Sequence, residues 1–133
     1  MRETSVAFEG LSPVPFAEAV TRAREALAGE GFGVLTEIDV QATIKAKLGV
    51  ERAPYVILGA CHAPSAHRAL EAAPEVGVLL PCNVTVSVEG GRTVVRAMKP
   101  ASVMGVIGKP ELAPIGEHVG EALRRVVAAC ERG

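Results

Sequence analysis

PYVILGACHAPSAHRALEAAPEVGVLLPCNVTVSV, residues 54–88, predicts a strand, a helix and a second strand in one short stretch. Residues 55–60 are an unbroken apolar or small run, which favours a strand inside a sheet that is buried on both faces. Pro64 disfavours helical backbone at the residue before it, so the helix is predicted to begin at Pro64 or Ser65. The strand therefore ends near Cys61, beside the start of this helix.

The same stretch holds the candidate site residues. Cys82 opens the second strand, and if the two strands are neighbours in one sheet, Cys61 and Cys82 come to the same region. His62 and His67 lie between them in the sequence, and Asn83 follows Cys82. The candidate ligand-binding residues are therefore Cys61, His62, His67, Cys82 and Asn83.

A metal site is one possible use of these residues, because nitrogen and sulfur ligands suit zinc or copper. The paired C-x-x-C spacing of structural zinc sites is absent, however, and Cys61 and His62 point to opposite sides if the backbone is extended. At best one of them would join His67 and Cys82, which leaves the ligand set incomplete. We therefore assign no metal site.

Thiol chemistry between Cys61 and Cys82 is an alternative. It needs a thiolate, which a nearby helix N-terminus or a protonated His62 or His67 would stabilise. The simplest interpretation of both cysteines remains structural, because free cysteine packs as a small hydrophobic residue. Cys130 falls on the apolar stripe of the predicted last helix and is expected in the core.

Composition predicts a single domain over residues 1–133. Fourteen basic and fifteen acidic residues leave a net charge of −1, and one Tyr, three Phe and no Trp offer few stacking platforms. No nucleic-acid partner is therefore expected. The first five residues contain no apolar signal segment, and no run approaches the ~20 apolar residues of a membrane helix. These features predict a cytoplasmic protein with no membrane partner and no disulfide framework.

Strand patterns occur at residues 3–8, 32–38, 55–60, 82–89 and 92–97. Gly10 is expected to end the first strand, and Ser12 to cap a helix that has Pro13 in its first turn. Asp39 is placed to cap a short helix that ends at Gly49. Gly90-Gly91 predicts a tight hairpin in which Glu89 pairs with Arg92.

Two further residues, Glu37 and His118, carry side chains that can take part in catalysis or binding. Glu37 and Asp39 lie beside the end of the strand predicted at residues 32–38. Asp39 already has a capping role, so Glu37 is the other acidic residue there. His118 lies near the start of the last predicted helix, beside its apolar stripe, and is interpreted as a surface or interface residue. Neither joins a catalytic constellation that spacing alone can assemble.

Three segments carry a resemblance to a known family: GFGVLTEIDV at 31–40, YVILGAC at 55–61 and LLPCNV at 79–84. With them the chain resembles, nearly end to end, the bacterial and archaeal domain of unknown function numbered three-oh-two. The resemblance implies a β-α-β-β-β-β-α order decorated by small helices, and a homodimer, but no reaction. The family's usual Asn-Pro pair after the first cysteine is replaced here by His62-Ala63-Pro64, and His62 can substitute as a hydrogen-bond donor.

We therefore expect an α+β domain with about five strands in a mainly antiparallel sheet and helices packed on one face. The predicted function is a small soluble module that binds a small molecule or metal through its Cys/His patch, with the ligand or cofactor unidentified. A thiol-dependent redox protein using Cys61 and Cys82 is one alternative. A structural homodimer that binds a protein partner is another.

Overall fold

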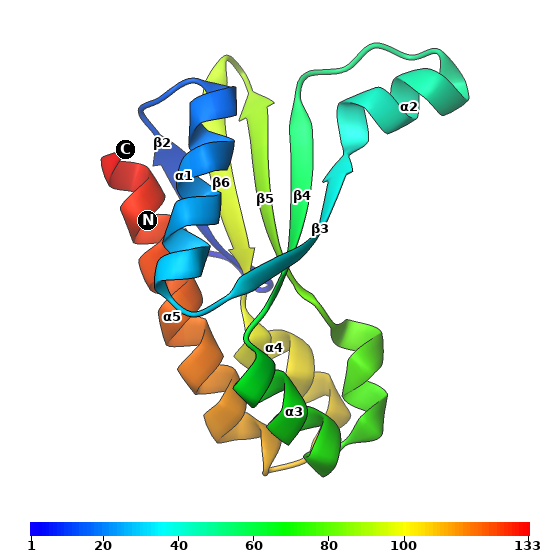
Figure 1. The fold of residues 1–133 in the computed structure, drawn as a ribbon, viewed down its shortest axis with the longest axis vertical. Helices are drawn as coiled ribbons and strands as arrows, with labels where there is room; N and C mark the ends of the chain where they lie inside the picture. Colours follow the sequence, from blue (N-terminus) through cyan, green and yellow to red (C-terminus); the bar gives the residue numbers. More distant parts are fainter.

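The computed structural model describes all residues from 1 to 133 and contains one six-stranded antiparallel sheet (Figure 1). The strand order across the sheet is β1-β2-β6-β5-β4-β3. The strands are β1 Arg2–Glu3, β2 Ala7–Ser12, β3 Gly33–Asp39, β4 Tyr55–Cys61, β5 Cys82–Glu89 and β6 Arg92–Met98. The predicted α+β class and the antiparallel sheet are confirmed.

Two long helices, α1 (Phe16–Gly29) and α5 (Leu112–Arg132), pack against one another and against one face of the sheet. The main core lies between these two helices and the sheet, and both helices and the inward residues of the strands contribute to it. Most of its side chains are Val, Ala and Leu, so the helix backbones approach the sheet closely. No helix of the structure is long and apolar enough to cross a membrane.

A smaller group of helices lies at one end of the sheet, at the bottom of Figure 1. Its members are α3 (Ala63–Ala72), the 3-10 helices η1 (Pro74–Leu79) and η2 (Gly105–Ile107), and α4 (Pro100–Met104). They share a second core cluster with the start of α5, formed by Ala69, Ala73, Val76, Met104 and Leu112. This helical end covers the point where β4 finishes and β5 begins.

Several local predictions are confirmed. The β5–β6 hairpin pairs Glu89 with Arg92, as the Gly90-Gly91 turn required, and both glycines have positive φ. The helix α2 (Val40–Leu48) begins at Asp39, whose Oδ1 accepts a hydrogen bond from the Ala42 N–H at 2.9 Å. It ends at Gly49, which is left-handed. None of its residues is buried.

The N-terminal prediction was wrong in its details. A turn divides the expected first strand into β1 and β2, which pair antiparallel and raise the number of strands to six. Gly10 continues β2 because it pairs with Val95 of β6. A Cβ there would lie 2.7 Å from Glu131 Cγ and 2.9 Å from Val127 Cγ1, so glycine leaves room for α5. Ser12 ends β2 and α1 begins only at Phe16, so neither Ser12 nor Pro13 belongs to the helix start.

The central stretch also needs two corrections. β4 lies inside the sheet as predicted, but its two faces are not equally buried. Val56, Leu58 and Ala60 are buried on the helix-covered face, whereas on the other face only Gly59 is buried and Tyr55, Ile57 and Cys61 are half-buried. α3 begins at Ala63, ahead of the predicted start at Pro64 or Ser65. Proline is tolerated in the first turn because the amide it lacks has no intrahelical acceptor there.

The contact between α4 and α5 depends on a glycine. A Cβ built at Gly116 of α5 would lie 3.1 Å from Ala101 Cα and 3.2 Å from Ala101 N, which are backbone atoms. These atoms cannot turn aside as a flexible side chain does, so a Cβ here would require the backbone of α4 to shift by a few tenths of an ångström. The close contact between α4 and α5 therefore depends partly on Gly116.

We expect Gly116→Ala to lower the free energy of unfolding by about 1–3 kcal/mol through overpacking. Gly29→Ala is the matched control, because its Cβ would meet no atom within 4 Å and its φ is not positive. The control should leave stability unchanged or slightly improved. Urea denaturation of both variants measures the difference, and equal stabilities would contradict a close contact at α4.

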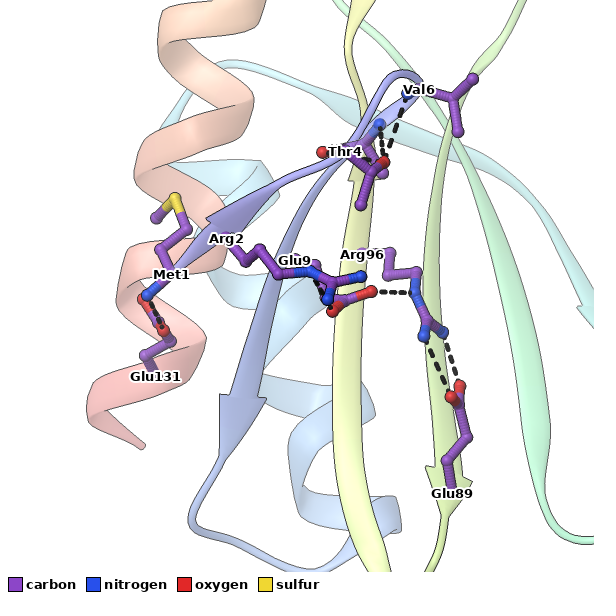
Figure 2. Close-up of polar contacts among 9 residues, drawn as sticks. Met1, Arg2, Thr4, Val6, Glu9, Glu89, Arg96 and Glu131 are labelled. Atoms are coloured by element: carbon purple, nitrogen blue, oxygen red, sulfur yellow. Dashed lines mark hydrogen bonds and ion pairs between the residues drawn. The ribbon is translucent and has the colours of Figure 1, made fainter.

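On the face of the sheet opposite the main core, Arg96 joins three strands through ion pairs (Figure 2). Its Nε donates to Glu9 Oε1 at 2.7 Å, and its two terminal nitrogens donate to Glu89. Ser87 Oγ also donates to Glu89, at 2.6 Å. The hydrogen bonds from Arg96, followed by that from Ser87, lower the Glu89 pKa from 4.5 to about 2.

Because folding lowers the Glu89 pKa, its contribution to stability is present above pH 4.5 and is lost as the pH falls toward 2. The Glu89 side chain is 42% exposed, so solvent screening keeps the contribution of the ion pair to about 1 kcal/mol or less. Glu89→Gln should therefore lose part of the stability at pH 7 and show a weaker decline between pH 4.5 and 2. Unfolding curves with an unchanged acid slope would count against this.

Candidate functional site

The candidate site is a pocket of about 260 Å³ at the helical end of the sheet. It lies where β4 ends and β5 begins, and α3, α4 and α5 contribute the remaining walls. A β-bulge in β3 leaves Leu35 unpaired and places it in the wall. The lining residues are mainly apolar: Leu35, Ala60, Cys61, His62, Ser65, Ala66, Leu80, Pro81, Cys82, Met104 and Ile115.

Three of the five predicted residues meet at this pocket. Cys61 and His62 end β4 and enter α3, and Cys82 opens β5 as the register partner of Ala60. β4 and β5 are thus neighbours in the sheet, as expected. Both cysteines line the same cavity, Cys82 buried and Cys61 half-buried.

The other two predicted residues lie elsewhere. His67 projects from α3 into solvent, with its side chain 75% exposed and Nε2 at 3.9 Å from Glu71. Helical spacing carries it to the face away from the pocket. Asn83 is exposed and pairs with Gly59, so it neighbours the pocket in sequence but is not part of its wall.

His62 is held in place by a residue that sequence analysis did not select. Its Nδ1 lies 2.7 Å from Ser65 Oγ, and Ser65 is only 2% exposed. The ring also packs against Phe32, with centroids 5.6 Å apart, and against the exposed His118, at 5.9 Å. The His62–Ser65 spacing across a helix start is the one signal that could have revealed this pair, since an N-terminal turn brings such residues together.

Met104 was also missed. It reaches the wall from α4, far along the chain, and is 3% exposed. No local pattern marks it, because only the packing of α4 onto α5 brings it beside the end of β4.

Burial controls the chemistry of the thiols. It raises the pKa of Cys82 from 9.0 to about 11, with a smaller contribution from the charge of Cys61. Burial raises the pKa of Cys130 to about 11 as well. Cys130 lies in the main core, as predicted, and is 1% exposed. At neutral pH both thiols are protonated and poor nucleophiles.

The structure contains no group of three or more His, Cys, Asp or Glu residues arranged to hold a metal ion. Cys61, His62, His67 and Cys82 therefore do not form a shared coordination sphere, since His67 points away. Glu37 pairs with Arg24, and Asp39 caps α2. These two acids accordingly have structural partners.

A larger pocket, of about 580 Å³, surrounds Phe8 and has charged walls. Arg124 and Lys99 lie over the Phe8 ring, with the guanidinium carbon and the ammonium nitrogen 5.0 and 5.9 Å from its centroid. Glu3 already pairs with Arg124 at 2.7 Å and approaches Lys99 at 3.9 Å. Because the two cations of this wall are already engaged, Arg124 by Glu3 and Lys99 by the Thr4 carbonyl oxygen, we favour the smaller apolar pocket as the functional site.

Fold and pocket together define a small α+β domain with one thiol- and imidazole-bearing cavity at a sheet end. Residues 8–130 match the model of the family described as Domain of unknown function DUF302, and the chain belongs to that family. It is similar to the crystal structure of the uncharacterized conserved protein DUF302 from Bacillus stearothermophilus, at 30% identity and a TM-score of 0.88. The likeness covers 93% of this chain and 97% of that one. No curated protein matches.

We expect Cys61 to be alkylated by iodoacetamide much faster than Cys82 or Cys130 in the folded protein. Cys61 is half-buried, whereas the other two thiols are buried and their pKa values are about 11. Peptide mass spectrometry after timed reaction at several pH values measures each rate, and the urea-unfolded chain is the control in which all three should react alike. Equal rates for Cys61 and Cys82 in the folded protein would contradict the burial of Cys82.

Proposed function

We propose that this protein is a binding module whose small, mainly apolar ligand occupies the pocket between Cys61, His62 and Cys82. The observation that carries the proposal is the composition of the pocket wall: an apolar cavity with a few converging polar groups is the usual form of a small-molecule site. The fold itself implies no activity.

The size and lining of the pocket limit the ligand. Its volume of about 260 Å³ lies just below the ~300 Å³ at which drug-sized sites begin, so the ligand has few heavy atoms. No Asp, Glu, Lys or Arg lines the wall, which disfavours a strongly charged ligand. The His62 imidazole and the Ser65 hydroxyl, already paired with one another, supply the polar contact.

Binding is favoured over thiol redox chemistry. A disulfide exchange that used both cysteines would need a thiolate to form readily, but burial keeps the Cys82 thiol protonated at neutral pH. A ligand gains from the same burial, because contacts in a dry apolar cavity are not weakened by water. A cytoplasmic homodimer, which the sequence and the family resemblance imply, stays a prediction.

Ala66 offers a direct test, because it lies in the pocket wall on α3. Ala66→Leu would fill part of the cavity and should weaken binding of the apolar probe indole by at least about tenfold, which corresponds to about 1.4 kcal/mol. Chemical-shift perturbation of the backbone amides measures the affinity and maps the binding position.

Ala63→Leu is the matched control: it makes the same change on the same helix, at an exposed position outside the pocket. It should bind indole as the wild type does. Shift changes that avoid the pocket residues, or equal affinities for the two variants, would overturn the proposed site.

A further inference from the structure

The pocket holds a serine and a histidine side chain in direct contact. Ser65 Oγ lies 2.7 Å from His62 Nδ1, and both residues line the cavity. Ser65 is 2% exposed and His62 is half-buried, so the contact is largely shielded from bulk water. A hydroxyl at about 2.6–3.2 Å from an imidazole nitrogen is the arrangement of a nucleophile and its general base.

Helix capping does not account for this contact. His62 is the N-cap residue of α3, where a capping side chain would accept a hydrogen bond from a backbone N–H of the first turn, as Asp39 does at α2. The His62 side chain makes no such bond, and its Nδ1 atom lies against the Ser65 hydroxyl instead. The contact between these two side chains therefore calls for another explanation.

The surroundings of the pair suit a reaction at Ser65. Phe32 and His118 pack on the His62 ring, with centroids 5.6 and 5.9 Å away, and restrict its rotation before any ligand arrives. Ser65 is the third residue of α3, so its N–H has no acceptor within the helix. The positive end of the helix dipole favours negative charge that develops beside Ser65.

The pocket wall limits which compounds can react there. No Asp, Glu, Lys or Arg lines the cavity, so an ion is poorly stabilised inside it. A neutral ester can enter, whereas the carboxylate formed by its hydrolysis is more stable in water and leaves. The volume of about 260 Å³ restricts the substrate to a small molecule.

We propose that Ser65 and His62 hydrolyse small, neutral, apolar esters, with Ser65 as the nucleophile and His62 as the general base. This inference rests on the proposed function, since it names the substrate class of the same pocket. The neutral imidazole takes the Ser65 proton at Nδ1 while Oγ bonds to the ester carbon, so no free alkoxide has to exist in the dry cavity.

The atoms of the reaction balance with water as the only co-reactant. The proton held by His62 passes to the leaving oxygen as the ester carbon–oxygen bond breaks, which releases an alcohol and leaves an acyl group on Ser65. Water then attacks this acyl group while His62 accepts a proton from it, and His62 returns the proton to Ser65 Oγ as the acyl–oxygen bond breaks. The products are one alcohol and one carboxylic acid.

The test is hydrolysis of phenyl acetate by the purified, untagged protein, followed by the release of phenol. Ser65→Ala and His62→Asn should each lower kcat/KM by at least about 100-fold. Asparagine is a preferred N-cap residue and can hydrogen-bond the Ser65 hydroxyl, but it is not a base. His62→Asn should therefore keep the stability of the wild type while it loses turnover.

Two exposed residues outside the pocket provide the matched controls: Ser102→Ala for the serine and His67→Asn for the histidine. Both variants should hydrolyse phenyl acetate as the wild type does. Turnover that survives Ser65→Ala or His62→Asn, or that falls equally in the controls, overturns the proposal.

Covalent labelling of the wild type keeps the proposal testable if Ser65→Ala fails to fold. Phenylmethanesulfonyl fluoride should stop turnover, and peptide mass spectrometry should place the sulfonyl group on Ser65. A label on Cys61 in its place overturns the proposal. If indole binds in the pocket but phenyl acetate is not hydrolysed, this inference fails and the proposed function stands; if indole does not bind there, the proposed function fails on its own test.

Discussion

The antiparallel pairing of β4 with β5 is the constraint on which the rest of the structure depends. Once Ala60 lies opposite Cys82, all residues between them must leave the sheet and return to it at the same end. This connecting segment forms α3 and η1, whose apolar side chains cannot reach the main core. A second cluster therefore forms beyond the end of the sheet, and the chain acquires a helical end with a cavity at the junction.

The helical end is positioned from the other side by α5. This helix extends beyond the sheet, so its C-terminal part covers the strands and its N-terminal part receives α4. Glycines permit both contacts: Gly10 in β2 makes room for Val127, and Gly116 makes room for the backbone of α4. With few aromatic residues in the core, close approach of backbones replaces large side chains as the source of packing.

The pocket follows from an incomplete fit between these two parts. The strand ends and the helical end meet along surfaces that belong to different core clusters, and the space left between them is lined by residues from both. Burial there favours neutral thiols and contacts with an apolar ligand over chemistry that needs a charged nucleophile. The paired His62 and Ser65 give this apolar space its one ordered polar feature.

Much of the local structure was predictable from sequence, because it depends on neighbours along the chain. Gly90-Gly91 sets the β5–β6 register through its turn geometry, and Asp39 caps α2 through an amide three residues away. The convergence of Cys61, His62 and Cys82 could be anticipated because two consecutive strands commonly pair. Ser12, in contrast, has the chemistry of a helix cap but is used by β2, where pairing with β6 outweighs local preference.

Only the tertiary structure decided which residues line the pocket, because several of them are distant in sequence or lie on elements whose orientation the sequence does not show. Met104 enters the pocket through the contact of α4 with α5, and Leu35 through a bulge in β3, and neither carries a local signal. His67 has the right chemistry and position in the sequence, but the rotation of α3 turns it into solvent. Sequence alone thus determined the element types and the neighbourhood of the site, because these follow from local periodicity and turn chemistry. The membership of the pocket was decided by packing between elements, which depends on shape across the whole chain.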